Sequence, residues 1–122
     1  MSALSDYIDA WNRNDPEAIV STVTPDAVVT ESYGPVYYGR DRIREWAEKW
    51  FDRGGRVRDW VITNEFAAGD ILVAEWRFDY RWEGEDLSFE GSTIATVREG
   101  KIASLREYAM TADSYTWDGE WR

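Results

Sequence analysis

The stretch "AEWRFDYRW", residues 74–82, alternates between apolar and charged side chains. One parity holds Ala74, Trp76, Phe78, Tyr80 and Trp82, and the other holds Glu75, Arg77, Asp79 and Arg81. A period of two is typical of a β-strand with one dry face and one wet face. Aromatic rings in a row on the dry face could pack against a helix, stack on nucleic-acid bases, or form the wall of a pocket for a small apolar molecule.

The composition removes several of these options. A chain of 122 residues is most simply one domain, 1–122, with enough length to bury a core. The formal net charge is −10, and an acidic domain repels phosphate backbones, which argues against base stacking and a nucleic-acid partner. No membrane partner is expected either, because no apolar run has the length of a membrane span. A cytoplasmic location is therefore the expectation.

The chain contains no cysteine and no histidine. Their absence excludes disulfides, thiolate catalysis, Ser-His triads and the usual transition-metal ligands. We therefore expect no metal site and no cofactor. Acid–base chemistry must fall to carboxylates, tyrosine or lysine.

Three helices are predicted in the first half of the chain. Leu4, Tyr7, Ile8 and Trp11 have helical spacing within 3–13, and "NDPEAIVSTV" restarts a helix whose dry stripe is Ile19, Val20 and Val23. "AVVTES" (27–32) reads as a short strand and "GPVYYG" (34–39) as a loop. A third helix carries apolar residues at helical spacing and ends at "RGGR": Ile43, Trp46, Ala47, Trp50 and Phe51.

The second half predicts four strands, over 57–67, 71–82, 87–97 and 101–110. Short connectors that contain glycine favour an antiparallel meander, so the fold class is α+β. The tail, 113–122, is patternless, and we expect it to be loose or to lie across the body. If Trp82 pairs with Leu87, then Phe78 faces Gly91 and Trp76 faces Thr93. Small residues opposite large rings favour a pocket, although ordinary interdigitation would give the same pattern.

Several stretches resemble the nuclear transport factor 2-like superfamily, and its SnoaL-like and ketosteroid isomerase-like branch in particular. They are "YIDAWNRNDPEAIVSTVTPDAVVTE", "YYGRDRIREW" and "VREGKIASLREY", and the resemblance covers roughly residues 4–112. The resemblance implies a cone-shaped fold, with three N-terminal helices packed on a curved, mostly antiparallel sheet that encloses a cavity. The aromatic row would then be a cavity wall.

The same resemblance implies roles for three residues. In ketosteroid isomerases a tyrosine of the first helix donates to the developing oxyanion and a carboxylate shuttles the proton; these positions fall on Tyr7 and Glu31. The second oxyanion donor of those enzymes falls on Thr93, which is a weaker donor. In limonene epoxide hydrolase, which is also similar, the last aspartate matches Glu107. Its Arg-x-Asp matches Arg77 and Asp79, which the strand parity turns outward, and its water-binding pair falls on Val29 and Glu31.

The direction of Glu107 depends on the turn at "REG". A three-residue turn with a bulge would face Leu105 and Glu107 inward, whereas a two-residue turn at Glu99-Gly100 would face Arg106 and Tyr108 inward. If Glu107 faces inward, two carboxyl groups share one aromatic cavity. Such a pair would suit proton shuttling, and it would equally suit binding a cation or an amine.

Three functions remain open: a cofactor-free isomerase, cyclase or dehydratase (lyase) acting on a hydrophobic carbonyl compound, a small-molecule binding protein, and a protein-association module. An epoxide hydrolase ranks below the first. Catalysis is expected from Glu31, Tyr7 and Glu107. Ligand binding is expected from Trp11, Trp46, Trp50, Trp76, Phe78, Tyr80, Phe89, Thr93 and Leu105. We also expect a homodimer through the polar outer face of the sheet, which carries Glu75, Arg77, Asp79, Arg81, Glu90, Thr96 and Arg106.

Overall fold

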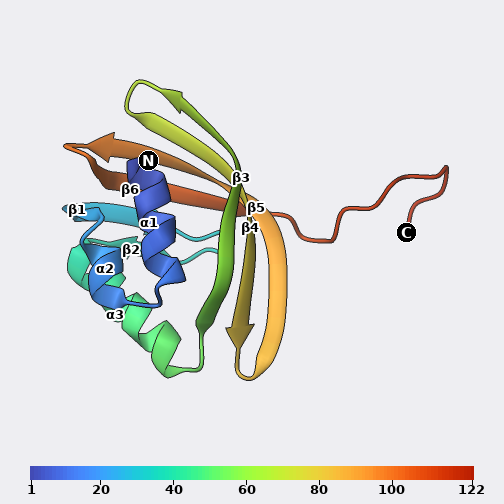
Figure 1. Ribbon diagram of the computed structural model, residues 1–122, viewed down its shortest axis with the longest axis horizontal. Coiled ribbons are helices and arrows are strands. Elements are labelled where there is room, and N and C mark those ends of the chain that lie inside the picture. The colour runs from blue at the N-terminus through green and yellow to red at the C-terminus, as the bar shows by residue number, and fades with distance from the viewer.

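A computed structural model describes residues 1–122 and shows helices packed on one curved sheet (Figure 1). The helices are α1 (Ala3–Asn12), α2 (Pro16–Val20) and α3 (Arg40–Asp52). The strands are β1 (Val23–Thr30), β2 (Val36–Tyr38), β3 (Arg56–Ala68), β4 (Ile71–Trp82), β5 (Glu85–Arg98) and β6 (Lys101–Ala109). The predicted α+β class and the curved, mostly antiparallel sheet are confirmed.

The sheet has six strands in the order β2-β1-β6-β5-β4-β3. The last four strands of the chain form the predicted antiparallel meander, and β2 pairs antiparallel with β1. Only β1 and β6 run parallel, with Val29 opposite Leu105 and Thr30 opposite Arg106. This long-range pairing brings Glu31, which follows the end of β1, beside Glu107, which lies near the end of β6.

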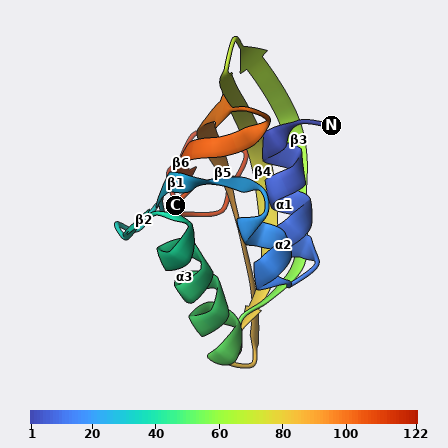
Figure 2. The ribbon, with the colours of Figure 1, turned by 90° about the vertical axis from the view of Figure 1, so that its left-hand side faces the viewer.

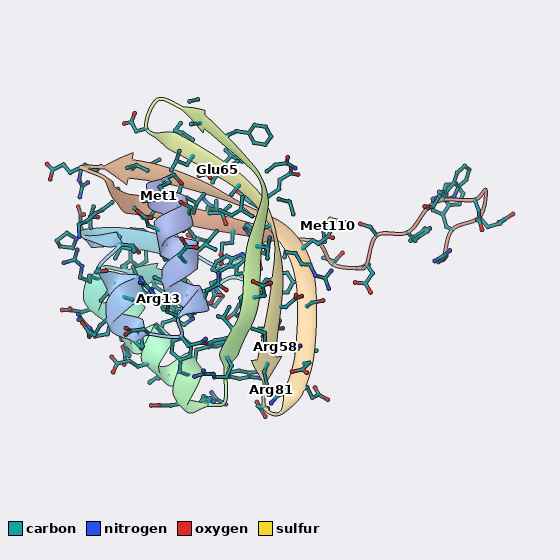
Figure 3. All side chains as sticks on the ribbon, viewed as in Figure 1. Met1, Arg13, Arg58, Glu65, Arg81 and Met110 are labelled. Carbon is teal, nitrogen blue, oxygen red and sulfur yellow. The ribbon has the colours of Figure 1, made fainter.

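The helices cover the concave face of the sheet. Figure 2 shows α1 and α2 beside β3, while α3 lies on the other side of the concave face, towards β2. Helix α1 begins at a capping box between Ser2 and Ser5, and it buries Leu4, Tyr7 and Trp11. The Ser2 side chain also hydrogen-bonds Glu65 of β3, and Figure 3 shows Met1 and Glu65 at the same end of the molecule. None of the helices has the length and apolar character needed to span a membrane.

Two predictions in the first half of the chain are wrong. Helix α2 ends at Val20, so Val23 belongs to β1, where it is fully buried and lies opposite Ile102. The expected loop "GPVYYG" contains β2, which pairs with β1 through Tyr38 opposite Val28. Val23 pairs with a strand that is distant in sequence, and β2 is too short to give a periodic pattern of its own.

The β4–β5 hairpin differs from its predicted register by two residues. Its turn is formed by Glu83 and Gly84 alone, both with positive φ (50° and 84°), so that Trp82 lies opposite Glu85. Trp76 consequently faces Gly91 rather than Thr93. A shift of two residues keeps every side chain on its predicted face, and the aromatic row still points towards the helices.

The β5–β6 hairpin combines parts of both predicted turns. The turn is the two-residue Glu99-Gly100, and the register shifts between Thr96 and Val97, which leaves Ala103 of β6 as an extra residue. This bulge turns Glu107 inward, opposite Thr93, and Tyr108 outward. The Met110 N–H still donates to the backbone oxygen of Glu90 at 2.9 Å; beyond it the chain leaves the sheet, and residues 113–122 extend away from the body (Figures 1 and 3).

Candidate functional site

A pocket of about 670 Å³ lies between the helices and the concave face of the sheet. Every helix and strand except α2, β1 and β2 contributes lining residues, and the residues that follow β1 also line the pocket. Its aromatic lining comprises Tyr7, Trp11, Tyr33, Trp46, Trp50, Trp60, Trp76, Phe78, Tyr80, Trp82 and Phe89. The remaining lining residues are Glu31, Ser32, Leu87, Ser88, Glu107, Ala109 and Met110.

The aromatic rings of the pocket hold one another in place. Trp50 stacks on Trp82 with ring centroids 6.1 Å apart, and Phe78 stacks on Tyr80 at 4.8 Å. Trp60 meets Trp76 edge to face at 5.4 Å. Contacts of this geometry stabilise the ring positions beyond the effect of burial, so the aromatic lining is preorganised for a ligand.

Gly91 fits beneath the ring of Trp76. A Cβ atom at this position would lie 2.6 Å from Trp76 Cη2 and 2.4 Å from the backbone oxygen of Tyr108. The absence of a side chain at Gly91 therefore makes room for the indole ring of Trp76. Trp76 lines the pocket, and Gly91 does not.

Glu31 lies directly after β1, where its carboxylate is held by two phenols. Tyr37 and Tyr33 both donate to Oε1, at 2.7 Å and 2.8 Å. Desolvation raises the pKa of Glu31, while these two hydrogen bonds favour the ionised form and oppose that shift. Tyr37 in turn stacks on Trp46 with ring centroids 4.3 Å apart, which fixes the geometry.

Glu107 lies beside Glu31 in the pocket, on the inner face of β6, and no hydrogen bond within the protein acts on its carboxyl group. Burial among apolar groups raises the pKa of Glu107 to about 8, and the negative charge of Glu31 contributes to the same shift. The two neighbouring carboxyl groups therefore have different environments: Glu31 accepts hydrogen bonds from two phenols, and Glu107 accepts none.

Tyr7 lies in the lining, on the inner face of α1. Its side chain is fully buried and its hydroxyl has no hydrogen-bond partner. Burial raises the pKa of Tyr7 well above its usual value, and the nearby Glu107 and Glu31 carboxylates raise it further, whereas the Trp11 indole lowers it. The phenol thus stays protonated and keeps its O–H available as a donor.

Two residues expected in the ligand site do not line the pocket. Thr93 is fully buried, and its hydroxyl accepts the hydrogen bond of the Trp76 indole N–H at 2.8 Å. Leu105 is 2% exposed and belongs to the apolar core. Both share a face with the lining residues but lie deeper, beneath the rings.

The epoxide hydrolase-like set is dispersed in this structure. Arg77 and Asp79 form an ion pair with each other at 3.0 Å on the outer face of the sheet. Val29 is a fully buried core residue. Of the positions that matched that enzyme, only Glu31 and Glu107 are in the pocket.

Sequence reasoning missed several lining residues. Trp82 shares the parity of Trp76, and Trp60 of β3 lies opposite Phe78 of β4. Strand alternation predicts the inward direction of Trp82, and strand pairing predicts that of Trp60. Ser32, Tyr33, Leu87, Ser88, Ala109 and Met110 lie at strand ends or in loops. Their positions follow from how the sheet curves, for which the local pattern gives no signal. No group of three or more acidic side chains in the chain could hold a metal ion.

Residues 4–105 match the model of the SnoaL-like domain, so the chain belongs to the SnoaL-like domain family. No curated protein matches the sequence. The solved structures that resemble it share the nuclear transport factor 2-like cone fold with it.

One such structure is a protein of ketosteroid isomerase-like fold from Catenulispora acidiphila in complex with trimethylamine (21% identity, TM-score 0.79, covering 87% of this chain and 83% of that one). Another is a candidate polyketide cyclase from Pseudomonas putida (21% identity, TM-score 0.75, covering 91% and 93%). A third is an epoxide hydrolase of M. tuberculosis (17% identity, TM-score 0.79, covering 88% and 80%). At these identities the likeness establishes the fold alone.

Proposed function

We propose that this chain is a cofactor-free enzyme that transfers a proton on a hydrophobic small molecule bearing a carbonyl group, as an isomerase, a cyclase or a dehydratase does. The observation that carries the proposal is the Glu107 carboxyl group, which lies unpaired in an aromatic pocket with its pKa raised to about 8. A proton-transfer group works best when its pKa lies near the working pH. Relatives of this fold named as a polyketide cyclase and an epoxide hydrolase are consistent with small-molecule chemistry in the pocket.

The proposed base is Glu107 rather than Glu31. Both carboxyl groups are available to a ligand, but the Glu31 oxygen already accepts two phenol protons, which makes it a weaker base. Glu31 instead orients the rim of the pocket and raises the basicity of its neighbour. Tyr7 is the proposed donor to the oxyanion, because its unpaired O–H lies close enough to sense the charge of Glu107.

The proposal can be tested by hydrogen–deuterium exchange of a probe ketone. 2-Tetralone has an apolar bicyclic frame and acidic protons beside its carbonyl, and a positioned base accelerates their exchange in D2O, which NMR measures. The rate should rise with pH and level off above about pH 8, where Glu107 is ionised. Glu107→Gln should lower it by about 10²–10⁴-fold, the usual contribution of a positioned base.

Two further variants control this experiment. Glu90→Gln removes an exposed carboxylate from the outer face of the neighbouring strand and should leave the rate unchanged. Tyr7→Phe should lower the rate without moving the midpoint of the pH profile, because a phenol that only stabilises charge does not titrate in this range. If the ketone binds but the wild type does not accelerate exchange, the pocket is a binding site and the enzyme proposal is wrong.

A further inference from the structure

The pocket has an uncompensated excess of acidic groups. Its lining includes Glu31 and Glu107 but no lysine and no arginine. The titratable groups that interact with Glu107 by charge are Glu31 after β1, Tyr33 in the β1–β2 loop and Tyr7 of α1. None of these groups is a cation. The arginine that precedes Glu107, Arg106, is exposed and points to the other face of the strand.

The two carboxyl groups are adjacent across the parallel β1–β6 pair. Thr30 lies opposite Arg106, so the residues that follow, Glu31 and Glu107, occupy neighbouring positions at the same end of the sheet. Two carboxylates that share a site repel each other, and a low-dielectric surrounding increases this repulsion. A positive charge between them would relieve it.

The pocket that holds this carboxyl pair is lined by aromatic rings from the helices and from the sheet. Glu31 accepts a hydrogen bond from Tyr37, which stacks on Trp46, and Trp46 lies 5.0 Å from Trp11 between ring centroids. Glu107 lies opposite Thr93, which holds the indole of Trp76. Tryptophan faces attract cations more strongly than other aromatic rings do, and desolvation increases the attraction.

We propose that the pocket binds an alkylammonium group, with its charge between Glu31 and Glu107 and its alkyl substituents against the rings of Trp11, Trp46 and Trp76. This inference rests on the proposed function and narrows the class of substrate that the pocket takes: a hydrophobic carbonyl compound that also carries an amine in its protonated or quaternary form. A cation at this place would hold both carboxyl groups in their ionised form. Substrate binding would thereby convert Glu107 into the base that proton abstraction requires.

The test compares two probes that differ only in charge. Choline and 3,3-dimethylbutan-1-ol have the same shape, and the alcohol carries a neutral carbon where choline has its quaternary nitrogen. Binding of each to the wild-type protein is followed by tryptophan fluorescence and by calorimetry. Choline should bind at least about tenfold more tightly than the alcohol, which corresponds to about 1.4 kcal/mol. The affinity for choline should also rise with pH as Glu107 loses its proton, because choline does not titrate.

Variants locate the cation. Glu107→Gln and Glu31→Gln should each weaken choline binding and leave the affinity for the alcohol unchanged, whereas Glu90→Gln should change neither. Measurements on the wild-type protein alone can overturn the inference. They would do so if the two probes bound with equal affinity, or if choline showed no saturable binding. If 2-tetralone exchange still depends on Glu107 in that case, only the substrate class is wrong and the proposed function stands.

Discussion

Glu107 shows how a single residue takes its chemistry from its surroundings. A glutamate on an exposed strand position would titrate in the usual acidic range. Here the bulge at Ala103 turns the side chain towards the helices, where apolar burial and the charge of Glu31 both disfavour ionisation. Nothing in the sequence "LREY" distinguishes the two directions, because one inserted residue decides which face Glu107 occupies.

The raised pKa of Glu107 predicts a pH dependence of stability. Between pH 4.5, the ordinary pKa of a glutamate, and about pH 8, the folded protein holds a proton that the unfolded chain releases. The free energy of unfolding should therefore fall as pH rises through this window, by at most about 1.4 kcal/mol per pH unit from this group. Glu31 contributes with the same sign, whereas the lowered pKa values of Asp26 and Asp86 act in the more acidic range.

Urea denaturation at a series of pH values between about 5 and 8 measures this slope. Glu107→Gln should flatten the curve, since the amide carries no charge at any pH in the window. Glu90→Gln, on the exposed face, should keep the wild-type slope. A Glu107→Gln variant with an unchanged slope would show that Glu107 titrates normally.

At the scale of elements, the free edge of β3 is closed by two asparagines, one at the end of α1 and one in the connection to α2. Asn12 accepts from Trp60 N at 2.8 Å and donates to Trp60 O at 2.9 Å. Asn14 makes the same pair of hydrogen bonds with Val57, at 2.7 Å and 3.1 Å, and has a positive φ of 53°, which asparagine tolerates well. These side chains take the place of a neighbouring strand, and they hold Trp60 against the pocket.

Asn12→Ala should therefore destabilise the protein and loosen the pocket together. The substitution leaves the backbone N–H and C=O of Trp60 without partners, a loss of about 1–3 kcal/mol in the free energy of unfolding. Thermal or urea denaturation measures the loss, and increased quenching of tryptophan fluorescence by acrylamide reports on the pocket wall. Asn64→Ala, on the exposed part of β3, is the matched control and should cost little. Equal losses in the two variants would contradict this role for Asn12.

The elements themselves divide into those that local pattern predicts and those that it does not. The strict alternation of 74–82 and the helical spacing in α1 and α3 predict their elements and their buried faces. The short strand β2 and the early end of α2 depend on pairing with β1 and on the turn at Ser21, and they have no periodicity of their own. The hairpin register was wrong by two residues because the sequence allows two turns of different length between Trp82 and Leu87.

At the scale of the whole molecule, the outer face of the sheet carries two kinds of surface. One end has the predicted charged side chains, and Figure 3 shows Arg58 and Arg81 near that end, where both pair with Asp86. The other end exposes apolar side chains outside the predicted polar set: Phe66 (57% exposed), Ile71 (45%) and Ile94 (43%). The outer face therefore carries an apolar end beside the charged side chains on which the homodimer prediction rests.

We still propose a homodimer through this face, with the apolar end contributing to an isologous interface. Sedimentation velocity at micromolar concentration should show a dimer for the wild type. Ile94→Asp places a charge in the apolar end and should shift the protein towards monomer without unfolding it, while Glu75→Gln at the polar end should have a small effect. A wild type that sediments only as monomer would contradict the proposal.

The bulge in β6, the parallel β1–β6 pairing and the three helices together place the Glu107 carboxyl group among aromatic rings. The most direct test of this account is the titration of the Glu107 side-chain carboxyl by carbon-13 NMR, with the resonance assigned by its loss in Glu107→Gln. The midpoint should lie at about pH 8, and it should move to lower pH when choline is bound. A midpoint near 4.5, the ordinary value for glutamate, would contradict it.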